Sequence, residues 1–481
     1  MKRSVSGLGK LIRPGRACTV FLLGATTAIA LSAQTFTTLL SFDFRDGSSP
    51  DAPLVQGVDG NLYGTTSSGG IDGGTVFTIT PSGALTTLYE FCFLGACPNG
   101  GYPAAPLALA AAGAFYGTTE RNGGYDQGTV FKITPGGALT TLYSFCGQGE
   151  CTDGAEPAAG LVQAADGNLY GTTFLGGANY AGTVFKITPS GALTTIHSFG
   201  SKESDGKFPY AGLVQAGDGD LYGTTWGGGA NSVGTVFRIT PSGALTTIHS
   251  FGSQPDDGQY PYAGLVEASD GSLYGTTFGG GAYAGGTVFK ITPGGALTTL
   301  FSFDSGGGGA PVAGRVLGTD GNFYGTTGYF GSNQGTVFQI TPGGTLTTLH
   351  TFCLESGCPD GADPLGGLVQ ATNGQFYGTT STGGAASNCT TCGTIFSLSV
   401  GLGPFVKTLP HSGRVGQIVR ILGTALTGAT AVTLNGIPAT FTFYSASEIT
   451  ATVPAGATTG TVEVTTPSGT LLSAGPFTVL P

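Results

Sequence analysis

The chain has 481 residues, of which only 9% are charged while 40% are hydrophobic. Disordered chains show the opposite balance, few apolar residues and many charges, so this composition predicts a folded protein. The formal net charge of −10 excludes proteins that bind nucleic acid or an anionic membrane through a broadly basic surface.

The first 33 residues have the pattern of a secretory signal peptide. They contain five basic and no acidic residues, an apolar run over 17–33, and small residues at Ser32 and Ala33. We therefore predict a signal peptide over 1–33, cleaved at Ala33, and a secreted or cell-surface protein of net charge −15. An uncleaved membrane anchor is the alternative. No later apolar run approaches the ~20 residues that span a bilayer, so no membrane span is expected after cleavage.

A motif, Tyr-Gly-Thr-Thr, recurs seven times at intervals of 50 to 54 residues. It begins at Tyr63, Tyr116, Tyr170, Tyr222, Tyr274, Tyr324 and Tyr377. A Gly-rich stretch follows each copy and leads to Gly-Thr-Val-Phe or Gly-Thr-Ile-Phe, which begins at Gly74, Gly128, Gly182, Gly234, Gly286, Gly335 and Gly393. Self-similarity at a fixed period of this length indicates a repeat architecture.

Each unit predicts four strands, which we name a to d. In the unit that contains Tyr170 they are 160–164, 169–173, 183–188 and 192–199. Asp166 and Gly167 form a hairpin signal between strands a and b. Val184 and Phe185 are adjacent and both apolar, so both faces of strand c are expected to be buried between stacked sheets.

The repeats predict an all-β fold, a seven-bladed β-propeller over 34–401 with repeats of about 52 residues. The seventh unit ends after strand c, whereas an orphan segment, 35–42, precedes the first unit and matches strand d of the others. We expect this N-terminal strand to complete the last blade and close the ring, which removes two exposed sheet edges. An open β-solenoid is the alternative.

From residue 402 the repeat is absent and short alternating strands take its place. They include 418–423, 432–436, 449–454, 460–464 and 476–479. Short strands with frequent turn signals predict a small immunoglobulin-like β-sandwich over 402–481.

These motifs resemble two known families. The pattern DGNLYGTT, then GG, then GTVFKITPSGALTTLYSF recurs in this order over about 36–400. It is similar to GloVer-type tandem repeats of secreted bacterial proteins. That resemblance implies no defined activity and no catalytic residues. Residues 404–481, with VTLNGIPATF and ITATVPAGATTGTVEV, resemble the IPT/TIG domain, which in secreted bacterial proteins implies a spacer or adhesive module.

Eight cysteines follow the predicted signal peptide, in closely spaced pairs. The pairs are Cys92 and Cys97, Cys146 and Cys151, Cys353 and Cys358, and Cys389 and Cys392. An even count in an exported chain predicts four local disulfides. A zinc site, which requires two pairs to converge, and redox catalysis by the last pair are the alternatives.

No residue pattern points to catalysis. Three histidines, His197, His249 and His350, occupy strand d, where other units have Tyr, Phe or Leu, and are expected to pack there. One set of aspartates, at the a–b turn, serves turn geometry. A second set in the loop between strand d and the next strand a predicts either a turn or a calcium-stiffened loop; it comprises Asp46, Asp153, Asp205, Asp257 and Asp360. We expect no catalytic residue, resident metal or cofactor.

The longest and most variable loops, b–c and d–a, emerge on one face of a propeller, and variable loops on a rigid scaffold commonly bind ligands. Aromatic residues follow the motif in three consecutive units or lie in the same loops: Phe174, Trp226, Phe278, Tyr180 and Tyr283. They predict a site for a glycan or a surface protein, with neutral ligands favoured because neither arginine nor acidic clusters are evident. The alternative is that they plug the channel mouth.

Three functions remain open at this point. The first is a non-enzymatic binding protein of the cell surface or matrix. The second is a structural or adhesive protein with no defined ligand. The third is a polysaccharide hydrolase or lyase that uses the central channel, which requires a facing pair of carboxyl groups. The sequence predicts no oligomeric state.

Overall fold

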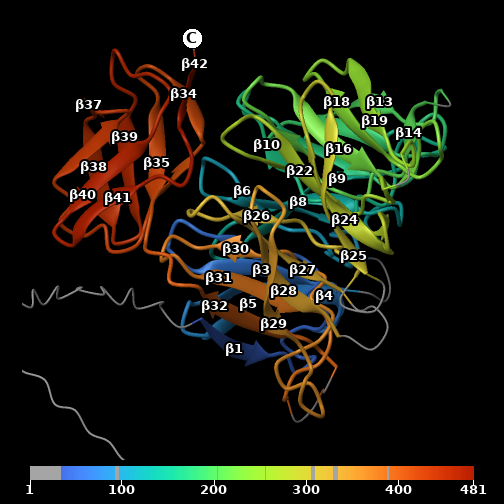
Figure 1. Ribbon diagram of the computed structural model, residues 1–481, viewed down its shortest axis with the longest axis horizontal. Coiled ribbons are helices and arrows are strands. Elements are labelled where there is room, and N and C mark those ends of the chain that lie inside the picture. Colours follow the sequence, from blue (N-terminus) through green and yellow to red (C-terminus); the bar gives the residue numbers. More distant parts are fainter. Residues whose placement is uncertain are drawn as a thin grey trace, which may run out of the picture. The chain divides into compact units, whose positions relative to one another are not determined.

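The computed structural model describes residues 34–92, 97–202, 204–254, 256–304, 309–328, 334–386, 389 and 391–480. The predicted signal peptide and its cleavage site at Ala33 lie outside them. The described residues form strands and turns (Figure 1). Among them there is no helix with the length and apolar character that a membrane crossing requires.

Seven sheets in the described residues share the predicted a-b-c-d order. The first three are β2 (Val55–Gln56), β3 (Leu62–Thr66), β4 (Asp72–Ile79) and β5 (Leu85–Cys92); β6 (Ala108–Leu109), β7 (Phe115–Thr119), β8 (Thr129–Ile133) and β9 (Leu139–Ser144); and β10 (Val162–Gln163), β11 (Leu169–Thr173), β12 (Thr183–Ile187) and β13 (Leu193–Ser198). The next two are β15 (Val214–Gln215), β16 (Leu221–Thr225), β18 (Thr235–Ile239) and β19 (Leu245–Ser250); and β21 (Val266–Glu267), β22 (Leu273–Thr277), β24 (Ala284–Ile291) and β25 (Leu297–Asp304). The sixth is β26 (Val316–Leu317), β27 (Phe323–Thr327), β28 (Thr336–Ile340) and β29 (Leu346–Thr351). Short loop strands β14 (Gly206–Lys207), β17 (Gly227–Gly228), β20 (Gly258–Gln259) and β23 (Gly279–Gly280) accompany the fourth and fifth sheets.

The N-terminal strand closes the ring, as predicted. Strand β1 (Thr35–Ser41) pairs antiparallel with β32 (Thr394–Ser399), which continues through β31 (Phe376–Thr380) to β30 (Val369–Gln370). This seventh sheet packs on the first, because Phe42 and Tyr377 share a buried cluster with Leu54 and Phe77. The contact between the last and first sheets excludes the open solenoid.

Each sheet buries both faces of its inner strands. All five residues of β11 are buried, and only Lys186 of β12 is partly exposed, whereas β13 is partly buried except at the exposed Thr194. Gly171 faces Phe185 across the β11–β12 pair, and a Cβ on this glycine would lie 2.6 Å from the Phe185 ring. The glycine of the repeated motif is therefore required so that the aromatic ring of strand c can lie over strand b.

Threonine hydroxyls form hydrogen bonds within each unit and between neighbouring units. The last Thr of each motif bonds the Thr of strand c, as Thr173 does with Thr183 at 2.8 Å. The preceding Thr donates to a carbonyl three residues before strand a of the next unit in six of the seven units: Thr65 to Ala105, Thr118 to Ala159, Thr172 to Ala211, Thr224 to Ala263, Thr326 to Gly366 and Thr379 to Ala52. These buried bonds explain why two threonines recur in the motif.

The C-terminal segment forms the predicted sandwich, drawn in orange to red in Figure 1. One sheet contains β33 (Lys407–Leu409), β35 (Ile418–Leu422), β39 (Glu448–Thr452) and β38 (Phe441–Ser445); the other contains β37 (Ile437–Pro438), β36 (Ala431–Leu434), β40 (Val462–Thr466) and β41 (Gly469–Leu472). Strands β34 (Ser412–Arg414) and β42 (Thr478–Leu480) pair in parallel. Val419, Ile421, Ile449 and Val464 lie in its buried core.

Candidate ligand-binding site at the channel mouth

The b–c and d–a loops meet at one face of the propeller, which we name the mouth face. Three positions of the repeat supply side chains there. The residues that follow the Tyr-Gly-Thr-Thr motif are Ser67, Glu120, Phe174, Trp226, Phe278, Gly328 and Ser381. Those that precede a proline at the end of the d–a loop are Ser49, Tyr102, Glu156, Phe208, Tyr260, Ala310 and Asp363, and those that follow the proline are Asp51, Ala104, Ala158, Tyr210, Tyr262, Val312 and Leu365.

The residue before the proline has the same unusual backbone in every unit. Its φ lies between 52° and 61° in all seven, although none is glycine. In the third unit, the Glu156 amide donates to the carbonyl of Gln127 in the preceding unit, and the Glu156 carbonyl accepts from the Phe174 amide at 2.9 Å. Left-handed residues are costly and persist only where their surroundings fix them. The backbone at the mouth face is therefore constant while its side chains differ between units.

The channel below this face is lined by strand a. A cavity of about 290 Å³ is bounded in each unit by the residue that follows the d–a loop proline. It is also bounded by the residue two positions after that one: Pro53, Pro106, Gly160, Gly212, Gly264, Gly314 and Gly367. The rings of Tyr210 and Tyr262 lie 4.1 Å apart at its upper end. Because most of the lining residues are glycine, alanine or proline, the channel remains open to a small molecule.

One side of the mouth is acidic. Asp51 and Glu120 line an adjoining cavity of about 290 Å³ together with Tyr102, Tyr210 and Tyr262. The Ser67 hydroxyl donates to Asp51 Oδ2 at 2.7 Å. Burial raises the pKa of Glu120 to about 7, the charge of Arg121 opposes this, and the charges of Glu156 and Asp51 add to it. The expectation that acidic residues do not cluster is therefore wrong, because ring closure brings together carboxyl groups that are distant in sequence.

The other side of the mouth is aromatic, and we name Phe174, Trp226, Phe278, Phe208 and Tyr260 the aromatic arc. Trp226 packs on Tyr260 with ring centroids 5.2 Å apart, and Phe174 packs on Phe208 at 5.4 Å. Trp226 is 39% exposed and Phe278 is 40% exposed. Phe174 also contacts Tyr210 of the channel, with ring centroids 5.6 Å apart.

Not all of the predicted residues join this arc. Tyr180 and Tyr283 are 60% and 64% exposed, and no ring contact among the described residues links either to the arc. Sequence reasoning missed Phe208, Tyr260 and the channel tyrosines. The sequence does carry a signal for these residues. The d–a loop proline recurs in every unit, whereas the residues on either side of it differ between units.

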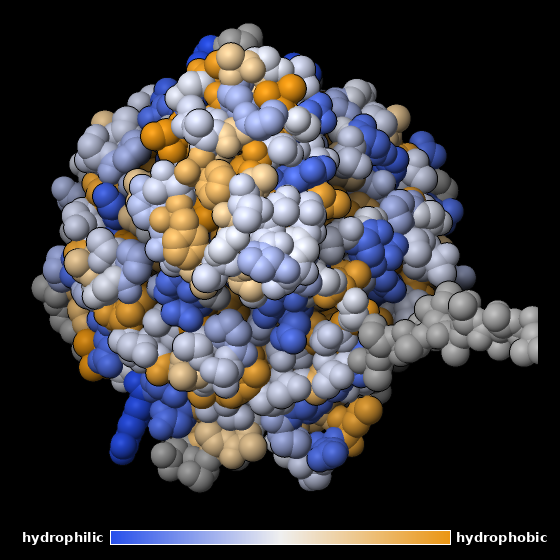
Figure 2. All heavy atoms as spheres, turned by 90° about the vertical axis from the view of Figure 1, so that its left-hand side faces the viewer, coloured by the Kyte–Doolittle hydropathy of each residue, from blue (hydrophilic) through white to orange (hydrophobic). Residues whose placement is uncertain are grey.

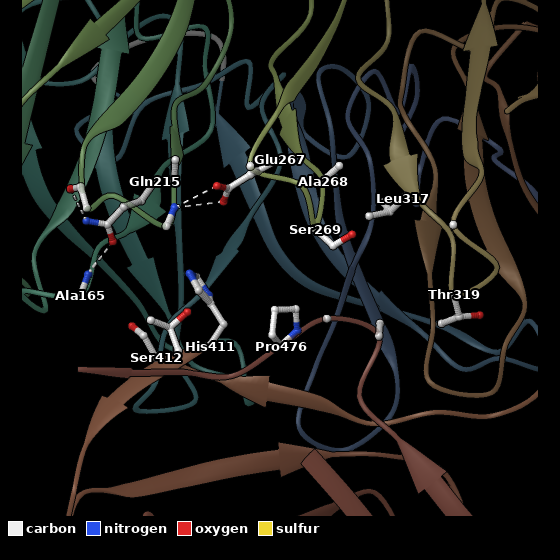
Figure 3. A pocket seen from close by; sticks show the side chains of 18 of the residues that line it. Ala165, Gln215, Glu267, Ala268, Ser269, Leu317, Thr319, His411, Ser412 and Pro476 are labelled. Carbon is white, nitrogen blue, oxygen red and sulfur yellow. Dashed lines mark hydrogen bonds between the residues drawn. The ribbon is translucent and has the colours of Figure 1, made fainter. Parts of the chain in front are cut away.

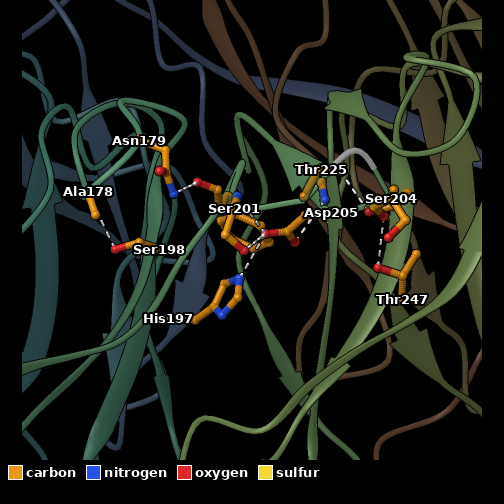
Figure 4. A network of polar contacts seen from close by, with 12 residues as sticks. Ala178, Asn179, His197, Ser198, Ser201, Ser204, Asp205, Thr225 and Thr247 are labelled. Atoms are coloured by element: carbon orange, nitrogen blue, oxygen red, sulfur yellow. Dashed lines mark hydrogen bonds and ion pairs between the residues drawn. The ribbon is translucent and has the colours of Figure 1, made fainter.

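The predicted strand d histidines are engaged in polar contacts as well as packing. His197 Nε2 lies 3.3 Å from Asp205 Oδ2, and Ser201 donates to the same carboxylate (Figure 4). His249 contacts Asp257 at 3.0 Å, and His350 contacts Asp360 at 2.9 Å. Burial raises the pKa of Asp205, but the bonds from His197 and Ser201 outweigh it and lower the pKa overall. These aspartates hold the d–a loop to strand d.

The described residues contain no group of three or more His, Cys, Asp or Glu arranged to hold a metal ion. The d–a aspartates of the calcium alternative instead accept protein hydrogen bonds, as Asp153 does from the Tyr143 hydroxyl at 2.7 Å. All four predicted cysteine pairs are disulfides: Cys92–Cys97, Cys146–Cys151, Cys353–Cys358 and Cys389–Cys392. Four disulfides are consistent with an extracellular protein.

A larger pocket, of about 450 Å³, is lined by a–b turns of the propeller and by His411 and Pro476 of the C-terminal domain (Figure 3). Two of its polar side chains already form hydrogen bonds within the protein. Glu267 accepts from the Gly217 amide at 3.0 Å, and Gln215 accepts from the Ala165 amide at 2.8 Å.

On the face drawn in Figure 2, apolar residues lie in small groups among hydrophilic ones. We therefore place the candidate site at the mouth face.

The fold and the site define an all-β propeller with an immunoglobulin-like C-terminal domain. Residues 21–152, 97–268, 148–327 and 253–437 match the Gloeobacter/Verrucomicrobia repeat, and residues 405–479 match the IPT/TIG domain. The chain belongs to the Gloeobacter/Verrucomicrobia repeat family and carries a C-terminal IPT/TIG domain. This combination suggests a surface module. No curated protein matches the chain.

Among the similar solved structures, one supports the fold. A fungal alcohol oxidase of the AA5 family, in complex with copper, has a TM-score of 0.52 at 14% identity, covering 93% of this chain and 99% of that one. The periplasmic gluconolactonase of Pseudomonas aeruginosa has a TM-score of 0.44 at 18% identity, covering 72% and 97%. A quinoprotein alcohol dehydrogenase-like protein of Bacteroides thetaiotaomicron has a TM-score of 0.41 at 13% identity, covering 62% and 65%. At these identities the likeness concerns the fold alone.

Proposed function

We propose that this protein is an exported, non-enzymatic binding module of the cell surface or extracellular matrix that recognises a glycan through its mouth face. One observation carries the proposal: side chains differ between units at three positions that share one fixed backbone. Where a scaffold is constant and its displayed side chains vary, the displayed side chains are the part that selects a ligand.

The chemistry of the arc favours a sugar. Trp226 and Phe278 are partly exposed, and Trp226 is held in place by Tyr260. Aromatic rings with an exposed face bind the apolar face of a sugar ring, and neighbouring polar groups bind its hydroxyls. Glu120 supplies such a group on the other side of the mouth, and its pKa of about 7 makes it both a donor and an acceptor near neutral pH.

Binding to an array of neutral and acidic oligosaccharides tests this proposal. The double variant Trp226→Ala, Phe278→Ala is expected to lose at least about tenfold in affinity, since two stacking contacts disappear. Tyr444→Ala is the matched control, because Tyr444 is 63% exposed on the C-terminal domain. Equal loss in the control, or no saturable binding by the wild-type protein, would instead favour a structural or adhesive protein without a defined ligand.

A polysaccharide hydrolase or lyase is the second candidate, favoured by the shared cavity of Asp51 and Glu120. A buried carboxyl group with a pKa of about 7 has the properties of a general acid at neutral pH. Glu120→Gln separates the two candidates. A binding module shows no turnover with Glu or with Gln at this position, whereas an enzyme shows turnover that this substitution abolishes.

A further inference from the structure

The interface between the fifth and sixth units differs from the other six in the buried residues described. Six motif threonines donate to a carbonyl just before strand a of the next unit, but the equivalent Thr276 Oγ1 is buried and has no hydrogen-bond partner. Strand a of the sixth unit also departs from the repeat. It carries Arg315 where the other units carry Leu54, Leu107, Leu161, Leu213, Leu265 and Leu368.

Arg315 is a buried cation whose donors are not used. The residue is only 8% exposed, and in the described part of the chain its Nε and Nη1 atoms have no hydrogen-bond partner. Burial lowers the pKa of Arg315 to about 9, with Tyr274 acting in the opposite direction, so the guanidinium is still charged at neutral pH. No carboxylate contributes to this balance.

Folding alone does not account for this arginine. A buried charge without a partner destabilises a protein, and an apolar residue of similar volume at the same place is the more stable choice. Six of the seven units have that apolar residue. Residues that reduce stability are typical of binding sites, where the missing partner belongs to the ligand.

We propose that the channel binds a small zwitterion, an amino acid or a short peptide, whose carboxylate pairs with Arg315 and whose ammonium group faces Asp51. Arg315 and Asp51 line the same cavity of about 290 Å³. A guanidinium binds a carboxylate through two parallel hydrogen bonds, and a carboxylate beside tyrosine rings suits an ammonium group. This site goes beyond the proposed glycan site, because it depends on the channel and not on the aromatic arc.

The charges at the two levels of the channel argue for a zwitterion over a simple anion. At the mouth, the charges of Asp51 and Glu156 act on Glu120, with Arg121 opposing them, whereas Arg315 lies in the channel lining below. An anion without a positive group meets this acidic entrance and is repelled. The volume is near the lower bound of about 300 Å³ for small-molecule pockets, which limits the ligand to a few residues.

Calorimetric titration with alanine, dialanine and trialanine tests the inference and determines the preferred length. N-acetylalanine keeps only the carboxylate, and alanine methyl ester keeps only the ammonium group. At least one zwitterion is expected to bind at least about tenfold more tightly than either blocked form, since each blocked form leaves one buried charge unpaired. Failure of all three zwitterions to bind at millimolar concentration would overturn the proposal, as would equal binding of a blocked form.

Arg315→Leu gives two opposite expected effects. The melting temperature rises by about 2 °C or more because the unpaired charge is removed, and zwitterion binding is lost. Arg238→Leu, which breaks a surface ion pair with Asp220, is the matched control and leaves zwitterion binding unchanged. If Arg315→Leu unfolds the protein or retains binding, Arg315 has a structural role and the inference fails. Trp226→Ala should leave zwitterion binding intact, so failure here and failure of the glycan proposal are distinguishable.

Discussion

The two faces of the propeller follow different rules. On the face of the a–b turns, contacts recur between units: in four of the seven units the motif tyrosine donates to the turn aspartate, as Tyr170 does to Asp166 at 2.8 Å and Tyr222 does to Asp218 at 2.7 Å. On the mouth face the backbone contacts repeat but the side chains do not. Selection for folding explains the first face, and the ligand that we propose accounts for the variation of the second.

The a–b face also joins neighbouring units. A strand a side chain accepts a hydrogen bond from the turn amide of the preceding unit at five of the seven interfaces: Gln56 from Thr372, Gln163 from Ala111, Gln215 from Ala165, Glu267 from Gly217 and Gln370 from Thr319. Four of these acceptors are Gln and one is Glu, so a side-chain oxygen at this repeated position stabilises the interface between units. The mouth face needs no such agreement between units.

The largest expected effect is on stability: truncating an aromatic side chain should destabilise the protein far more at a repeated position than at a varied one. Phe237 is fully buried, so Phe237→Ala should lower the free energy of unfolding by about 3–5 kcal/mol. Trp226 is 39% exposed, and Trp226→Ala should cost about 1 kcal/mol or less. Urea unfolding followed by circular dichroism measures both, since the second variant removes the only tryptophan. Equal losses would mean that the arc is part of the core.

The pH dependence of stability offers a second, intermediate effect. The pKa of Glu120 rises from 4.5 to about 7 on folding, so the folded state holds this proton more tightly. The stability that this proton contributes is fully present below pH 4.5 and is lost as the pH rises to about 7. The free energy of unfolding should fall by no more than about 3 kcal/mol over this range.

Thermal melts of the wild-type protein and Glu120→Gln across this pH range check the prediction. The variant should show a flatter dependence between pH 4.5 and about 7. Glu150→Gln, at an exposed loop position, should follow the wild-type curve. Identical curves for Glu120→Gln and the wild-type protein would mean that Glu120 is not desolvated at the mouth.

The smallest expected effect tests the a–b face. Gln215→Ala removes the acceptor of the Ala165 amide and a donor to the Gly219 carbonyl, and should lower the free energy of unfolding by about 0.5–1.5 kcal/mol. Gln215→Glu should retain the acceptor, because Glu267 performs the same role in the next unit. A loss in the Glu variant as large as in the Ala variant would show that the amide bond is not what stabilises the interface.

The sequence predicted the strands, the closing role of 35–42 and the cysteine pairs because each depends on neighbours in the chain or on a repeated pattern. The acidic side of the mouth depends on ring closure instead, which brings Asp51 and Glu120 to one cavity. The hydrogen bonds of the strand d histidines were also missed. Their partners lie only 8 to 10 residues away, but the loop conformation that brings Asp205 back to His197 is not visible in composition or spacing.

Arg315 illustrates a different limit. Comparison of the units shows the replacement of leucine by arginine, but a sequence does not say whether a charged side chain is buried or paired. The packed interface of the fifth and sixth units supplies that information. Departures from an internal repeat are therefore most informative where the structure leaves a buried polar group unsatisfied.

The fluorescence of Trp226 tests the central claim, that the mouth face holds the ligand, most directly. It is the only tryptophan and lies partly exposed within the aromatic arc. During titration with oligosaccharides its emission should shift saturably, and the shift should be absent in Phe278→Ala or weakened with the same loss of affinity. Binding detected by calorimetry without any change in this emission would place the glycan elsewhere and contradict the account.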